Sequence, residues 1–164
     1  MIETFIIQSP VGGLKMTLES ERLKTIEFSG QTQSKAPVSK VAKIIQRQLL
    51  NYFDRPQAKF EIDIMGQGTD FQRRVWDALN QIPCGQVMTY GEMAEKLGTS
   101  ARAIGNACRR NPTPIVVPCH RIVAANGLGG FAGAVQGELP TIKQRLLQIE
   151  GLAPLSSQLP LEAV

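Results

Sequence analysis

Cysteine and histidine are scarce in this sequence of 164 residues, which has three cysteines, one histidine and neither type within residues 1–65. Because protein zinc sites are built mainly from cysteine and histidine, this absence excludes a structural zinc in that segment. No segment approaches the roughly 18 apolar residues that span a bilayer. The amino-terminal residues also lack the basic start and apolar stretch of a secretory signal. We therefore expect a cytoplasmic protein with free thiols and no membrane partner.

Acidic side chains are absent from one long segment, which extends from Lys96 to Gly137. The whole chain has a net charge of +4 and a pI near 9.1. Five basic residues fall within the acid-free segment: Lys96, Arg102, Arg109, Arg110 and Arg121. One interpretation is a basic face that is merely solvated. We favour nucleic acid as the partner, because the positive charge is concentrated in one part of the chain.

The first part of the chain has the pattern of a small antiparallel sheet covered by a helix. Short apolar runs separated by turn residues predict strands, at residues 5–7, 14–18 and 23–28. Apolar residues recur at helical spacing over 41–53, which predicts one amphipathic helix against that sheet.

A further strand and a domain joint are expected after this helix. Apolar and other residues alternate over 60–64, which is typical of a strand. The glycines at 66 and 68 indicate the joint. We therefore predict a structural domain over 1–66, with no identifiable chemistry, and a second domain over 67–164.

The second domain is predicted to be mostly helical. An apolar stripe over 71–82 indicates a helix that begins near Thr69 or Asp70 and ends at Pro83. The next helix begins with Thr89 and Glu92 at the spacing of a capping box, in which each residue caps a backbone N–H of the other.

A helix-turn-helix is expected at residues 89–110. Gly98 suits the left-handed position that ends the first of its helices, and a second helix is predicted over 101–110. The second helix leaves its arginines free, as in a helix that contacts DNA. Alone this indication is weak, because helical hairpins are common.

Cys119 lies where one apolar run bends into another. The run 115–117 predicts a short buried strand, and the Asn-Gly pair at 126–127 predicts a tight turn after the second run. A lone cysteine is usually a small core hydrophobe. Here His120 and Arg121 follow directly, and a reactive thiol needs such a base or positive field to be held largely as thiolate.

His120 needs help to act as a base for Cys119. Adjacent side chains point apart, so we expect a bridging water between the thiol and the imidazole. The second ring nitrogen needs an orienting acceptor from elsewhere in the fold. Glu150, at the end of a helix predicted over 140–150, is one candidate, although a solvated acid at a helix terminus is the simpler interpretation of its position.

Residues 118–122 read PCHRI and follow the segments TYGEMAEKLG, SARAIGNACRRNP and NPTPIVV. This order of segments, over 68–151, resembles the O6-alkylguanine-DNA alkyltransferases. The resemblance implies an α+β fold, in which a small amino-terminal sheet domain precedes a winged helix-turn-helix domain with the active-site cysteine. It implies a monomer that binds double-stranded DNA from the minor groove and flips the damaged base. The methyl or other alkyl group then moves irreversibly to Cys119, once per molecule and without cofactor or metal.

The resemblance also assigns roles to individual residues. Cys119 is the nucleophile, His120 the water-mediated base and Glu150 the acid that orients the imidazole, while Asn111 ties the turn together. Tyr90 donates to the guanine ring as negative charge develops on it, which stabilises the departing base; in the simpler interpretation it is an ordinary half-buried aromatic residue.

Three further groups of contacts follow from the same resemblance. The backbone carbonyls of Cys119 and Ile122 read the exocyclic amine of guanine. The alkyl pocket is formed by Phe131, Ala132 and Gly133. The DNA contacts are made by Ala101, Arg102, Arg109 and Arg110. Arg102 is the finger that replaces the flipped base, or in a simpler interpretation a phosphate contact.

The loop after Phe131 is longer than in the family, which leaves the range of alkyl groups open. Three rival functions differ in chemistry. A damage sensor of the alkyltransferase-like kind lacks the thiol that Cys119 provides. A thiol hydrolase using Cys, His and Glu turns over repeatedly. A zinc site formed by His120 and the three cysteines has unsuitable ligand spacing.

Overall fold

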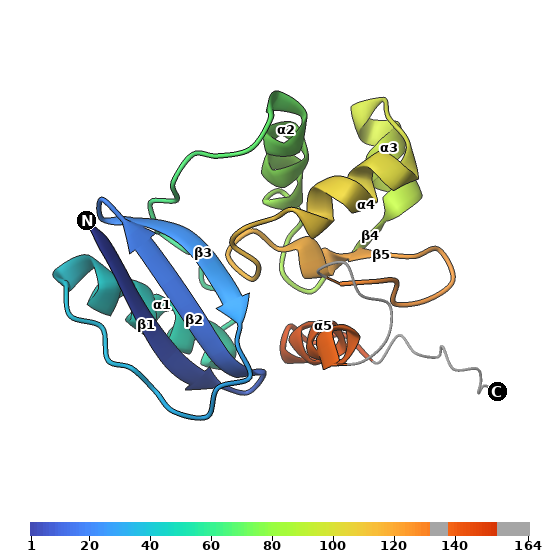
Figure 1. The fold of residues 1–164 in the computed structure, drawn as a ribbon. Coiled ribbons are helices and arrows are strands. Elements are labelled where there is room, and N and C mark those ends of the chain that lie inside the picture. The colour runs from blue at the N-terminus through green and yellow to red at the C-terminus, as the bar shows by residue number, and fades with distance from the viewer. Residues whose placement is uncertain (132–137, 154–164) are drawn as a thin grey trace. The chain divides into compact units, whose positions relative to one another are not determined.

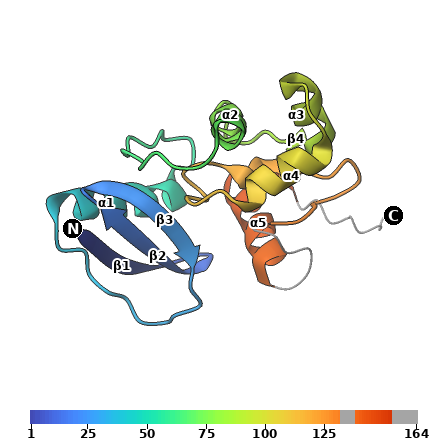
Figure 2. The ribbon, with the colours of Figure 1, turned by 45° about the horizontal axis from the view of Figure 1, so that its top comes forward.

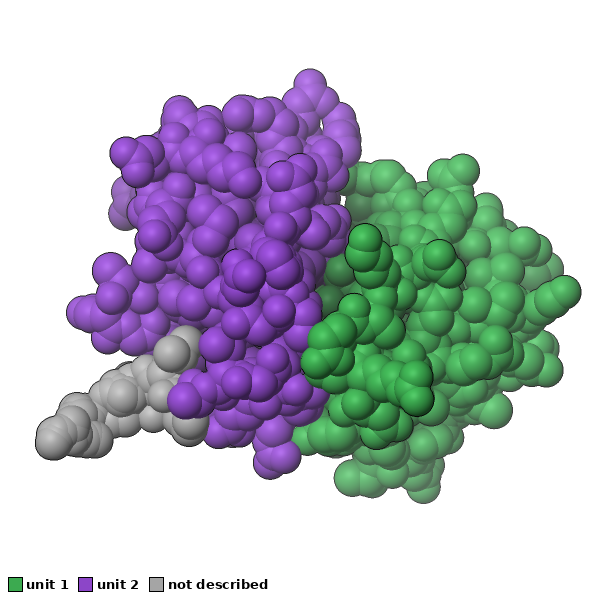
Figure 3. Space-filling model, turned by 180° about the vertical axis from the view of Figure 1, so that it is seen from behind, with its two compact units in different colours: residues 1–67, 112–116 green, residues 68–111, 117–164 purple. Residues whose placement is uncertain are grey.

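The computed structural model describes residues 1–131 and 138–153 and has the predicted α+β fold. The chain divides into two compact units, Met1–Gln67 with Pro112–Val116 and Gly68–Asn111 with Val117–Val164, which are coloured separately in Figure 3. The first boundary falls at the predicted glycine joint. The prediction placed residues 112–116 in a continuous second domain, but they belong to the first unit. There the Ile26 N–H donates to the Pro112 carbonyl at 2.9 Å.

The first unit contains a three-stranded antiparallel sheet in the order β1-β2-β3 (Figure 1). Its strands are β1 (Ile2–Ser9), β2 (Gly12–Glu19) and β3 (Arg22–Phe28). Alternate residues point to one face, where Phe5, Leu14 and Met16 are wholly buried. The three predicted strands are therefore confirmed.

Helix α1 (Lys40–Asp54) packs against one face of this sheet, as the two views in Figures 1 and 2 show. Ser39 caps it by accepting a hydrogen bond from the Ala42 N–H at 3.1 Å. Its buried residues are Ala42, Ile45, Leu49 and Tyr52. The predicted amphipathic helix is confirmed, and the core of the first unit lies between it and the sheet.

The strand predicted over 60–64 does not form. Ile64 makes only an isolated parallel bridge to Leu23, through hydrogen bonds that join Leu23 to the backbone of Asp63 and Met65 at 2.9 and 2.8 Å. The side chain of Phe60 instead stacks on Tyr52, with ring centroids 5.6 Å apart. The alternation of apolar residues thus reflects one-sided packing of an extended segment.

The second unit contains four helices within its described residues. They are α2 (Asp70–Leu79), α3 (Tyr90–Leu97), α4 (Ala101–Arg109) and α5 (Glu138–Ile149). Both α2 and α3 begin with complete capping boxes, at Thr69 and Thr89. Gly98 ends α3 with φ of 70°, the left-handed conformation predicted for it. No helix in the described ranges is long and apolar enough to cross a bilayer.

Helices α3 and α4 pack together as the expected helix-turn-helix, and α2 packs on α4. The only tryptophan, Trp76, joins α2 to α4 by donating its indole N–H to the Ala107 carbonyl at 2.9 Å. Two short strands, β4 (Met88–Thr89) and β5 (Ile122–Val123), pair in parallel. This pairing brings the start of α3 beside the chain that leaves Cys119.

The buried strand predicted over 115–117 is wrong, although all three residues are buried. Residues 115 and 116 form a turn, and Ile115 has φ of 76°. A β-branched residue rarely adopts this left-handed conformation, and it cannot continue an extended strand. The chain therefore bends sharply before it reaches Cys119. The tight turn predicted at 126–127 lies one residue earlier, at 125–126, since Ala124 and Gly127 form the bridge that closes it.

Candidate active site

Cys119 begins a single 3₁₀ turn, η1 (Cys119–Arg121). Pro118 precedes it, and its carbonyl accepts a hydrogen bond from the Arg121 N–H at 3.0 Å. The Asn111 side chain donates to the Val117 carbonyl at 2.8 Å, which holds the approach to the turn. Cys119 itself is 6% exposed. The nucleophile predicted from the sequence is therefore placed in a short, fixed turn and is nearly enclosed.

His120 and Glu150 lie together in the interior of the second unit. The His120 Nε2 and a Glu150 carboxylate oxygen are 2.7 Å apart, and both side chains are fully buried. Because a carboxylate can only accept, Nε2 must carry the proton. His120 Nδ1 is buried and has no hydrogen-bond partner among the described residues. The simpler interpretation of Glu150 as a solvated acid is therefore wrong.

Arg121 holds the same carboxylate from a second direction. Its Nε and one terminal nitrogen donate to the two oxygens of Glu150, at 2.9 and 3.0 Å. Its other terminal nitrogen donates to the Ile82 carbonyl at 2.6 Å. Paired N–H bonds to a carboxylate fix its plane as well as its position. The orientation of Glu150, and through it that of His120, is thus set by Arg121.

Burial dominates the electrostatics of this site. It raises the pKa of the Cys119 thiol, while a hydrogen bond from the Asn111 side chain and the charge of Lys143 act to lower it. Burial likewise lowers the pKa of His120, against the opposing effect of Glu150. The resting pair is therefore a thiol and a neutral imidazole. This differs from the thiolate that the sequence analysis expects, because the sulfur is enclosed.

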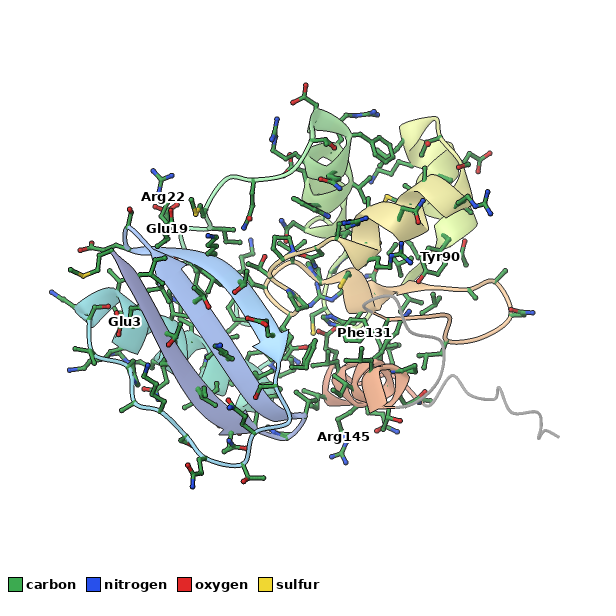
Figure 4. All side chains as sticks on the ribbon, in the orientation of Figure 1. Glu3, Glu19, Arg22, Tyr90, Phe131 and Arg145 are labelled. Atoms are coloured by element: carbon green, nitrogen blue, oxygen red, sulfur yellow. The ribbon has the colours of Figure 1, made fainter. Side chains whose placement is uncertain are left out.

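Tyr90, at the start of α3, forms part of the surroundings of this turn. Its hydroxyl makes a long contact of 3.4 Å with the Gly130 carbonyl, and burial raises its pKa. A Cβ added at Gly129 would lie 3.1 Å from a Tyr90 ring carbon, so the chain passes close to the ring there. Phe131 is buried, and Figure 4 shows it between Tyr90 and α5.

Lys143 of α5 is the main feature of the site that the sequence analysis misses. It is completely buried, and its ammonium donates to the Gly130 carbonyl at 2.7 Å. The only sign of its burial in the sequence was that this lysine lies among the apolar residues of the helix predicted over 140–150. The Arg121 contact with Glu150 was also missed, because it joins residues 29 positions apart. Ala132 and Gly133, predicted for the alkyl pocket, lie outside the described residues.

The predicted DNA-contacting residues lie on the outside of α4 and just after it. All four are exposed: Ala101, Arg102, Arg109 and Arg110. Ala101 and Arg102 occupy the first turn of the helix, whereas Arg109 and Arg110 line a hollow of about 440 Å³ beside the start of α2. Cys119 is not among the lining residues of this hollow. The two pairs thus lie at opposite ends of α4, and only the second pair lines the hollow.

Ile122, predicted to read the substrate through its carbonyl, is wholly buried at the start of β5. Its N–H donates to the Cys119 carbonyl, which closes the turn. Ile122 pairs with Met88 of β4. Within the described residues, no three cysteine, histidine, aspartate or glutamate side chains come together as metal ligands.

Fold and site together define a cysteine-dependent group-transfer protein with a helix-turn-helix. The model of the protein family described as "6-O-methylguanine DNA methyltransferase, DNA binding domain" matches residues 70–152. A methylated-DNA–protein-cysteine methyltransferase of Methanosarcina acetivorans is 39% identical over 155 residues, covering 89% of this chain and 96% of the other. The corresponding protein of Mycolicibacterium paratuberculosis is 37% identical, over 92% and 93% of the two chains.

Solved structures give the same result. The O6-methylguanine methyltransferase of Mycobacterium tuberculosis has a TM-score of 0.76 and 32% identity, over 99% of this chain and 97% of that one. The OGT protein of the same organism in complex with DNA has a TM-score of 0.73 and 34% identity, over 88% and 90%. The chain belongs to the methylated-DNA–protein-cysteine methyltransferase family, and its enzyme class is that of the family.

Proposed function

We propose that this protein repairs double-stranded DNA by moving the alkyl group of O6-alkylguanine irreversibly to the sulfur of Cys119, once per molecule. The observation that carries the proposal is the buried pair formed by His120 and Glu150 directly after the cysteine, with His120 Nδ1 left without a partner among the described residues. A neutral imidazole held in one tautomer is ready to take up a proton.

Ionisation of the thiol is the first step. The proton of Cys119 passes through a water molecule to His120 Nδ1, because adjacent side chains in a turn do not meet directly. Glu150 then stabilises the imidazolium across the 2.7 Å contact, in the way that a buried carboxylate supports a catalytic histidine. Asn111 supports the sulfur by donating a hydrogen bond that favours its charged form.

Transfer of the alkyl group is a single substitution. The sulfur forms a bond to the alkyl carbon as the bond from that carbon to O6 of guanine breaks, and the electron pair moves onto the guanine ring. Tyr90 donates a hydrogen bond to the ring as this charge develops, which stabilises the departing base. The resulting thioether has no good leaving group, so one transfer consumes the protein.

The base must leave the helix before this step, because the alkyl carbon is out of reach inside a stacked duplex. We assign entry from the minor groove to α4, with Ala101 close to the groove and Arg102 in the space of the flipped base. The exposed Arg109 and Arg110 suit contacts to phosphates.

Recognition of the flipped guanine is assigned to the turn after the cysteine. The carbonyls of Cys119 and Ile122 accept hydrogen bonds from the exocyclic amine. The Cys119 carbonyl already accepts from the Ile122 N–H, which leaves its second lone pair for the substrate. The buried Phe131 supplies part of the wall for the alkyl group.

Intact-protein mass spectrometry tests the proposal. After incubation with a duplex containing one O6-methylguanine, the protein should gain the mass of one methyl group, and peptide mapping should place it on Cys119. A Cys119→Ala variant should bind the duplex and transfer nothing. The partly exposed Cys84 provides a matched control, since Cys84→Ala should behave as the wild type.

The same experiment separates the rival functions. A thiol hydrolase would release product repeatedly and keep its mass, so more than one product molecule per protein contradicts the proposal. A damage sensor would bind the lesion without any gain in mass. Methylation of Cys84 or Cys108 in place of Cys119 would also overturn the assignment of the nucleophile.

A further inference from the structure

Lys143 on α5 is completely buried but has no acidic partner in the described part of the chain. Lysine is almost never fully buried unless it is paired. Its ammonium has three N–H donors. One donates to the Gly130 carbonyl at 2.7 Å, and the nitrogen lies 5.7 Å from the centre of the Tyr90 ring. A carbonyl and an aromatic face orient a cation, but neither neutralises its charge.

The groups that can carry a compensating negative charge are few. Glu150 is already bound by His120 and Arg121. Burial raises the pKa of Tyr90, and it raises that of Cys108 to about 12, so both remain neutral near pH 7. The Lys143 charge favours the anion of both Cys108 and Cys119. Cys119 differs because the Asn111 side chain also donates to its sulfur, and because it begins the turn η1, on which α5 packs.

We propose that Lys143 is the positioning residue that supplies the counter-charge for the Cys119 thiolate. The inference rests on the proposed function and deepens it. Proton transfer from Cys119 to His120 creates one negative and one positive charge. Glu150 opposes the positive charge on the imidazolium, and Lys143 opposes the negative charge on the sulfur. The ammonium gains and loses no proton during alkyl transfer, and the leaving electron pair goes to the guanine.

The pairing explains how an enclosed sulfur can become reactive. Burial lowers the pKa of Lys143 to about 8, and negative charge on Cys119 or Cys108 raises it. By linkage, each charge of the pair therefore makes the other easier to form. Three other titratable groups interact with this pair: Tyr90 and Cys108 with the charge on Cys119, and His120 with that on Lys143. Arg121 acts on His120. The Gly130 carbonyl keeps the ammonium in place.

The test is the pH dependence of Cys119 alkylation by iodoacetamide, followed by peptide mass mapping. This probe needs no DNA, so its result is independent of whether the protein repairs O6-alkylguanine. In Lys143→Met, which keeps the length of the side chain, the midpoint of the reaction should move up by about one to three pH units. Lys143→Arg, which keeps the charge, should remain close to the wild type.

Arg145 provides the matched control on the same helix. It is exposed, and Figure 4 shows it extending from the side of α5 away from Phe131. Arg145→Met should leave the midpoint unchanged. An unchanged midpoint in Lys143→Met, or equal shifts in the Met and Arg variants of Lys143, would overturn the proposal. So would a shift of the same size in Arg145→Met.

A second measurement requires no substitution of Lys143. The ammonium can be titrated by nuclear magnetic resonance of the lysine side chains, in the wild type and in Cys119→Ala. Removal of the sulfur should lower the pKa of Lys143, since the thiolate that favours its charge is lost. An identical Lys143 pKa in both proteins would contradict the pairing. Loss of methyl transfer with normal iodoacetamide and Lys143 titrations would instead contradict the proposed repair function.

Discussion

Glu150 controls both the tautomer and the basicity of the imidazole at the centre of the site. Its carboxylate accepts from His120 at 2.7 Å and is held on the other side by Arg121. The tautomer is fixed because the carboxylate cannot donate. The basicity follows from the charge, since Glu150 opposes the lowering of the His120 pKa by burial.

Glu150→Gln should therefore slow methyl transfer to Cys119 by at least about tenfold, since a positioned general base contributes 10²–10⁴-fold. The His120 pKa should fall further when the negative charge is lost. In the pH profile of the methyl-transfer rate, the rise that accompanies deprotonation of His120 should then move to lower pH. The rate at the plateau should fall. Single-turnover rates on a methylated duplex between pH 5 and 8 measure both effects.

The exposed Glu95 of α3 is a suitable control for this experiment. Glu95→Gln removes the same charge from the second unit and should leave the rate profile unchanged. Circular dichroism checks that Glu150→Gln is folded, because the change leaves Arg121 with a neutral partner. A normal rate and profile in a folded Glu150→Gln protein would remove this carboxylate from the mechanism.

At the scale of elements, α4 carries two kinds of arginine. Arg102 lies in the first turn, whereas Arg109 lies in the last turn beside the hollow shared with α2. Both are exposed, so neither contributes much to packing. Their difference in position fits the proposed division, in which Arg102 replaces the flipped base and Arg109 only neutralises phosphates.

Arg102→Ala is expected to slow repair of a duplex by about tenfold or more, because unstacking a base costs a few kcal/mol. On a single-stranded substrate, whose base is already accessible, the loss should be small. Arg109→Ala should weaken repair of both substrates and reduce the salt dependence of binding. Equal losses on duplex and single strand in Arg102→Ala would make Arg102 a phosphate contact.

The elements that sequence could predict are those fixed by local chemistry. Capping residues specify α2 and α3, and periodic apolar residues specify α1 and the three-stranded sheet. The segments at 60–64 and 115–117 were predicted wrongly. Residues 60–64 form no strand because a strand needs a partner to pair with. Residues 115–117 form none because Ile115 adopts a left-handed conformation.

In the site, too, the residues close together in sequence could be predicted, whereas the contacts between distant residues could not. The segment around Cys119 predicted the nucleophile that we propose and the histidine beside it. The residue pattern alone offered the distant Glu150 only as a candidate, and its role came from the family resemblance, while Lys143 was not found. Burial of a lysine is decided by packing in three dimensions, so its sequence position within an apolar stripe gave no more than an indication.

At the scale of the whole molecule, the first compact unit is built from two separate stretches of chain. Pro112–Val116 belongs to it, although its neighbours on both sides belong to the second unit. Thr113, Ile115 and Val116 are buried there. A fragment that begins at the predicted joint would therefore lack the rest of the first unit, in which these residues are buried.

A fragment of residues 68–164 should consequently be less stable than the full chain. Exposing Ile115 and Val116 alone costs about 3 kcal/mol or more, at roughly 1.5–3 kcal/mol for each large buried apolar side chain. Trp76 is the only tryptophan and lies in the second unit, so its fluorescence reports on that unit in both proteins. The urea midpoint should fall in the fragment. Equal midpoints would show that residues 112–116 need no support from the first unit.

Because residues 112–116 belong to the first unit, that unit is joined closely in sequence to Cys119. The chain re-enters the second unit at Val117, two residues before the sulfur, and passes through the rigid ring of Pro118 on the way. A crosslink that strains the first unit at residues 112–116 is therefore expected to change the rate at which Cys119 accepts a methyl group.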